Sequence, residues 1–132
     1  FKRTSPHPNL ITFDCPDSNV TCVKRNISNT PIAALATLNN SVFTDAAKAM
    51  AKRLIKEKDS DSERIAMGFQ LCTARKPSTR EADAFLALLK KAELYYQENE
   101  TEAEAFNGDA EASAWATLTR IFLNLDEFIT RE

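Results

Sequence analysis

Residues 79–98 read TREADAFLALLKKAELYYQE and follow directly on Ser78. Ser78 and Glu81 have the spacing of a capping box, a helix start in which the two side chains accept each other's backbone N–H groups. After this start, apolar residues recur at alternating steps of three and four, which places them on one face of a helix. These residues are Ala82, Phe85, Leu89, Ala92 and Tyr96. The stretch therefore predicts a helix over Thr79–Glu98 that buries one face.

The same patterns predict helices on both sides of this segment, at 31–38, 41–56, 61–75 and 110–129. Thr30 is a good N-cap, and the following Pro31 suits the first helical position, where its missing N–H costs nothing. The last helix has an apolar stripe that begins at Trp115 and runs to Ile129, so we expect this helix to be central. The predicted fold is all-α, a compact bundle of four main helices plus the short one at 31–38.

The composition agrees with helices and argues against nucleic-acid binding and against a membrane-spanning segment. The 132 residues include 19 alanines, two glycines and only three valines, a bias that favours helix over sheet. The formal net charge is −2, and nucleic-acid binding depends on a basic excess that is missing here. No run of about 18 apolar residues occurs, so we expect no transmembrane segment.

Two segments depart from the helical pattern. Residues 1–30 hold three of the five prolines, and we expect an irregular N-terminal strap there, with a short strand around 10–13, ahead of a helical domain at 31–132. The opening residues read like the middle of a chain, so we expect a fragment of a larger multidomain protein. Residues 98–111 carry six acidic and no basic side chains, which favours a solvated loop with a turn at Asn107-Gly108.

A small set of polar residues is the candidate for a site shared with other parts of a longer protein. The set comprises Asp14, Asp17, Arg25, Asn39, Asp126 and Glu127. The two N-terminal aspartates suit an acid–base pair or a hard cation, although turn formation beside Pro16 is the favoured interpretation. Arg25 suits an anion or a structural ion pair with those aspartates. The other three residues lie beside apolar stripes, where polar groups either cap helices or face a shared site.

The cysteines exclude covalent haem within this chain. Attachment of a c-type haem needs Cys-x-x-Cys-His, whereas the single histidine, His7, precedes Cys15, Cys22 and Cys72. With only four Cys and His residues in all, a zinc site is not expected, and we predict no cofactor in this chain. A Cys15–Cys22 or Cys22–Cys72 disulfide and three free thiols remain open alternatives.

Six segments, taken in order, resemble the C-terminal part of the domain of unknown function that accompanies planctomycete cytochrome c-like domains. The segments are KRTSP at 2–6, TFDCPD at 12–17, KRN at 24–26, NTP at 29–31, AALATLNN at 33–40 and LNLDEFITRE at 123–132. The resemblance implies a large exported parent protein, periplasmic or at the cell surface, with haem only in a separate upstream domain. Carbohydrate-binding-like modules in some such proteins imply a polysaccharide-related role. No reaction is assigned to the domain, so the resemblance transfers no catalytic residues.

Two functional hypotheses follow from the sequence. The favoured one is a non-catalytic scaffold or interaction domain, because nucleophile–base pairs and metal ligands are scarce here. Its expected partners are neighbouring domains of the same parent protein, with polysaccharide as a further candidate. The alternative is that the acidic candidates contribute to a hydrolytic or glycan-processing site shared with upstream domains. The sequence leans against enzymatic activity of the chain by itself.

Overall fold

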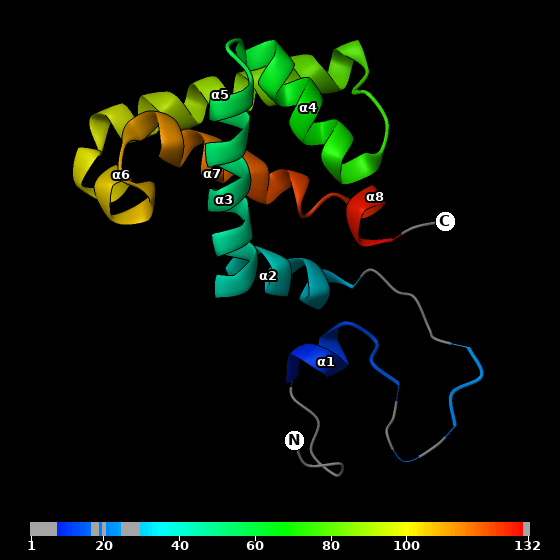
Figure 1. The fold of residues 1–132 in the computed structure, drawn as a ribbon. Coiled ribbons are helices and arrows are strands. Elements are labelled where there is room, and N and C mark those ends of the chain that lie inside the picture. Colours follow the sequence, from blue (N-terminus) through cyan, green and yellow to red (C-terminus); the bar gives the residue numbers. More distant parts are fainter. Residues whose placement is uncertain (1–7, 17–18, 20, 25–29, 131–132) are drawn as a thin grey trace.

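A computed structural model describes residues 8–16, 19, 21–24 and 30–130. Within these residues the chain forms eight α-helices and no strand, which confirms the all-α prediction (Figure 1). The helices are α1 (Pro8–Thr12), α2 (Pro31–Asn39), α3 (Ser41–Glu57), α4 (Asp61–Thr73), α5 (Thr79–Glu98), α6 (Glu100–Asn107), α7 (Ala110–Phe122) and α8 (Asp126–Ile129). None of the helices among the described residues is long and apolar enough to cross a membrane.

Side-chain caps start the main helices where the sequence predicts them. Ser78 and Glu81 form the complete capping box at the start of α5. Thr30 accepts from the backbone N–H of Ala33 at 3.1 Å, and Ser60 accepts from that of Glu63. Asn40 accepts from the N–H of Val42 at 2.9 Å, so one residue separates α2 from α3 and turns the chain between them. Each cap satisfies N–H groups that have no partner within the helix.

Helix α7 is the centre of the fold. It packs against α3, α5 and α6, and most of its residues are buried. Trp115 and Phe122 are completely buried, and the Phe122 ring meets the Phe85 ring edge to face with 5.0 Å between centroids. The buried Thr119 hydroxyl lies 2.8 Å from the carbonyl of Ala47 and bonds α7 to α3. The part of the predicted apolar stripe that lies on α7, Trp115, Leu118 and Phe122, is thus in the core.

Three local predictions are wrong. The strand expected around 10–13 is helix α1, because Pro8 suits a first helical turn and the left-handed Asp14, with φ 52°, lets Cys15 N–H close the helix on the Leu10 carbonyl at 2.9 Å. The acidic loop is largely helix α6. Its face at Ala103 and Phe106 packs inward, while Glu100 and Glu102 lie in the first turn, where negative charge is favourable. Gly108, with φ 101°, ends this helix at the predicted turn.

The third error concerns the last helix, predicted as continuous over 110–129. Helix α7 ends at Phe122, and α8 begins at Asp126 after a turn. Within that turn, the Asn124 side-chain carbonyl accepts a hydrogen bond from the Thr37 hydroxyl of α2. Leu125 still packs against the core, so the apolar spacing continues through a break in the backbone. The local sequence pattern does not predict that the helix ends at Phe122. The end coincides with a hydrogen bond between Asn124 and Thr37, which are 87 residues apart.

Gly68 lies where α4 meets α3 and α7 at close range. A Cβ atom there would come within 2.7 Å of the Phe122 ring and 2.9 Å of Leu54 Cδ1. We expect Gly68→Ala to destabilise the fold by about 1–2 kcal/mol, because overpacking a rigid core outweighs the gain of about 1 kcal/mol in helix propensity. Urea unfolding measures this difference. Gln70→Ala, at an exposed position of α4, is the matched control, and equal stability of the two variants would contradict the close packing.

Candidate functional site

The structure separates the predicted site residues into two groups. Asp126 and Glu127 open α8, whereas Asp14 follows α1 and Asn39 ends α2, where its side chain donates to the Leu35 carbonyl at 2.9 Å. Asp17 and Arg25 lie outside the described residues. The pair on α8 lines one cavity together.

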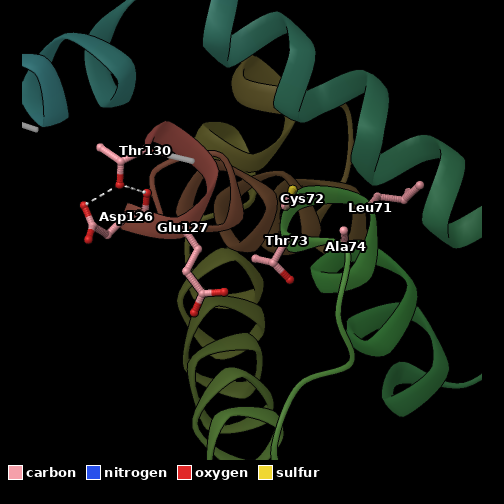
Figure 2. A pocket seen from close by; sticks show the side chains of 7 residues that line it. All are labelled: Leu71, Cys72, Thr73, Ala74, Asp126, Glu127 and Thr130. Atoms are coloured by element: carbon pink, nitrogen blue, oxygen red, sulfur yellow. Dashed lines mark hydrogen bonds between the residues drawn. The ribbon is translucent and has the colours of Figure 1, made fainter. Parts of the chain in front are cut away.

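That cavity lies between the end of α4 and α8 and has a volume of about 610 Å³. Its lining consists of Leu71, Cys72, Thr73, Ala74, Asp126, Glu127 and Thr130. Figure 2 shows Asp126 and Thr130 joined by hydrogen bonds at one side, with residues from α4 at the other. The Thr130 hydroxyl lies 2.9 Å from the Asp126 carbonyl and 3.4 Å from its carboxylate. The cavity is therefore a polar opening between the C-terminal end of α4 and the short helix α8.

Arg75 lies beside this cavity and pairs with two carboxylates at once. Ala74, with a left-handed φ of 60°, ends α4 and turns the chain into Arg75. The guanidinium donates to both oxygens of Glu127, at 2.9 and 2.6 Å, and to both oxygens of Glu81, at 3.0 and 2.7 Å. Its Cζ also lies 4.7 Å from the centroid of the Phe69 ring. This double bidentate pairing joins the end of α4 to the first turn of α5 and the first turn of α8.

The pairing with Arg75 determines the protonation state of one carboxylate that lines the cavity, that of Glu127. Hydrogen bonds from Arg75 lower the pKa of Glu127 and keep that side chain ionised. The pKa of Glu81 is lowered in the same way, with further hydrogen bonds from Ser78. A carboxylate held in this state accepts hydrogen bonds and ion pairs but is a poor proton donor, because general acids need a pKa close to the working pH.

The cysteines favour one of the two alternatives left by the sequence. Cys15, Cys22 and Cys72 all carry free thiols in the structure. Cys72 lines the cavity, where burial raises the pKa of its thiol to about 11. The thiol is therefore neutral at physiological pH, and only the thiolate is an effective nucleophile or metal ligand. The cavity does not activate this cysteine.

Among the described residues, no group of three or more His, Cys, Asp or Glu side chains is arranged to hold a metal ion. The cavity supplies the carboxylates of Asp126 and Glu127, two threonine hydroxyl groups and the neutral thiol of Cys72. These groups suit hydrogen bonding and ion pairing with a bound group.

Sequence reasoning missed the most highly connected residue of the site. Arg75 was only the predicted end of a helix, and Glu81 was only part of a capping box. Arg75 and Glu127 are 52 residues apart, so only the packing of α8 beside α4 brings them together. The capping box was a partial signal, since it holds Glu81 at the first turn of α5 with its carboxylate available to Arg75.

The Arg75 pairs predict a pH-dependent contribution to stability. Both glutamates have lowered pKa values, so the contribution is present above the ordinary glutamate pKa of about 4.3 and is lost as the pH falls through the folded-state values. We expect Arg75→Gln to lower the urea midpoint at pH 7, and the difference from wild type to shrink in 1 M NaCl and below about pH 4. Urea unfolding at several pH values checks this.

Arg53→Gln is the matched control for the Arg75 variant. Arg53 makes a single exposed pair with Glu57 at 2.8 Å, so its loss is expected to shift the midpoint less. An Arg75→Gln midpoint that stays below wild type by the same amount at every pH would show that the arginine acts through packing on Phe69.

Comparison with known proteins supplies a family. The sequence model of one protein family, described as PSD1, protein of unknown function (DUF1553), matches residues 1–89 of the chain. No curated protein matches the chain, and no solved structure matches it. The matched region includes α1 to α4, Arg75, Glu81 and the first half of α5. Because the match spans more than half of the 132 residues, the chain belongs to the PSD1 (DUF1553) family of proteins of unknown function.

Proposed function

We propose that this chain is a non-catalytic interaction domain whose partner is an apolar surface of a neighbouring domain in the same longer polypeptide. The observation that supports the proposal is the outer face of α2, which we define as Ile32 and Leu35. Their exposed fractions are 68% and 58%. Large apolar side chains left this exposed are favoured at contact surfaces, because covering them removes apolar area from water.

The composition of α2 supports the same proposal. The helix reads PIAALATLN and carries no charged residue. Ala33 and Thr37 are buried on its inner side, whereas Ile32, Leu35 and Asn39 recur at helical spacing on the outer side. A helix that is apolar on nearly all sides is expected to be covered all round. The part of the partner that covers the outer face of α2 is expected to be uncharged and apolar, since a charged group there would lose its hydration without gaining an ion pair.

The alternative is a contribution to a hydrolytic or glycan-processing site shared with upstream domains. Its support is that Asp126 and Glu127 line one cavity. Against it, the lowered pKa of Glu127 suits an electrostatic contact and does not suit the acid that glycoside cleavage requires. Asp126→Asn and Glu127→Gln test this alternative. Loss of an activity of the parent protein at an unchanged melting temperature would favour it over the interaction domain.

We further propose that the parent protein is exported, periplasmic or at the cell surface, and linked to a cytochrome c-like region. The support is the resemblance carried by the segments at 2–6, 12–17 and 123–132. In this proposal haem is bound only upstream, because Cys-x-x-Cys-His does not occur in the chain. A polysaccharide is the proposed ligand of the parent as a whole, to be tested by a glycan-binding screen.

The interaction proposal predicts which surface mutations weaken docking. Calorimetric titration of the chain into the remainder of its parent protein is expected to show binding that Leu35→Gln weakens about tenfold, a loss of about 1.4 kcal/mol of apolar contact. Leu94→Gln is the matched control, because Leu94 lies on α5 and is 60% exposed. Equal effects of the two variants would place the contact elsewhere, and no binding by the folded chain would contradict the proposal.

A further inference from the structure

Two basic side chains converge on one aromatic ring where α3, α6 and α7 meet. Lys48 Nζ of α3 lies 4.9 Å from the centroid of the Phe106 ring, and Arg120 Cζ of α7 lies 5.9 Å from it. The ring of Tyr96 is parallel to that of Phe106, at 6.1 Å between centroids. All four side chains are half-buried. The site therefore holds two positive charges in a partly desolvated aromatic surrounding.

These two cations differ from the other half-buried arginine of the described chain. Arg64 lies over Trp115 in a similar way, yet it pairs with Glu111 at 2.8 Å and with Asp61 at 3.6 Å. By contrast, no carboxylate among the described residues forms an ion pair with Lys48 or Arg120. Burying charge is costly unless an opposite charge compensates it, and the ring supplies only part of that compensation.

The hydrogen bonds of Arg120 leave most of its capacity unused. One Nη donates to the carbonyl of Leu38, near the C-terminal end of α2. The buried Nε has no hydrogen-bond partner among the described atoms. A guanidinium has five N–H donors, so capping α2 accounts for only one of them. Because Nε is buried, the donors left for a planar, negatively charged acceptor from outside are those on the Nη groups.

We propose that Lys48 and Arg120 bind a carboxylate, supplied by an aspartate or glutamate side chain of the docking partner. This inference rests on the proposed interaction function. Arg120 donates to the carbonyl of Leu38, and the next residue, Asn39, lies on the outer side of α2. The apolar face gives the contact its area, and the cation pair gives it register and orientation, as charged groups at interfaces do. An apolar surface with one acidic side chain at its edge is the complementary partner.

The first experiment tests the carboxylate site without the partner. Acetate is titrated into the isotopically labelled chain, with sodium chloride at equal ionic strength as the reference, and the Arg120 Nε–H signal is followed by NMR. The expected result is a saturable change in the chemical shift of this signal. Lys48→Gln is expected to lower the apparent affinity for acetate at least threefold. Lys52→Gln, an exposed lysine one turn further along α3, removes the same charge and is expected to leave the shift unchanged. Lys48→Gln is the main variant because Arg120→Gln also removes the bond to Leu38.

The second experiment uses the partner and separates the two proposals. In calorimetric titration with the remainder of the parent protein, Lys48→Gln is expected to weaken binding about tenfold, and more so at low salt. No saturable acetate shift, or an equal shift in Lys48→Gln and wild type, would overturn the carboxylate site. Binding that Leu35→Gln weakens but Lys48→Gln does not would overturn this inference and leave the interaction domain standing. No binding at all would remove the interaction domain and the partner assignment with it.

Discussion

The close packing around Phe122 is the constraint on which the rest of the structure depends. Its ring meets Phe85 of α5 at 5.0 Å and Phe69 of α4 at 6.4 Å between centroids, and it approaches the backbone of Gly68. Leu54 of α3 reaches the same glycine. One side chain at the end of α7 thus sets the approach of two other helices, α4 and α5. Interiors packed this densely tolerate little change in volume, so the helix ends that form the cavity are held in place by the core.

The Arg75 cluster shows how that core determines a surface feature. With α4 and α5 fixed through Phe69 and Phe85, the segment between them carries Arg75, the first turn of α5 carries Glu81, and α8 adds Glu127. Exposed ion pairs contribute little to stability when they stand alone. The Arg75 guanidinium, bound by two carboxylates, still has a structural consequence. It links the end of α4 to α5 and α8, and it keeps the carboxylate of Glu127 charged.

The sequence predicted those features that depend on near neighbours. Capping at Ser78 and the apolar stripe of 79–98 involve residues within one helix, so local pattern was enough for them. The end of α7 and the pairing of Arg75 with Glu127 depend on segments far apart in the chain, and no local pattern encodes them. Helix α6 was missed for a different reason. Its acidic composition is typical of a solvated loop. However, Ala103 and Phe106 provide enough apolar surface for this short helix to pack against α7.

The position of α7 in the chain has a consequence for how the protein is made. This helix is central in space but follows α1 to α6 in sequence, and its residues 110–122 leave the ribosome after all of those helices. Until it emerges, α3, α4 and α5 have no Trp115 or Phe122 to pack on, and their inner faces stay open to other chains and to chaperones. Ribosome-bound chains that stop before residue 110 therefore lack a closed interior, and this core is completed only once α7 has emerged.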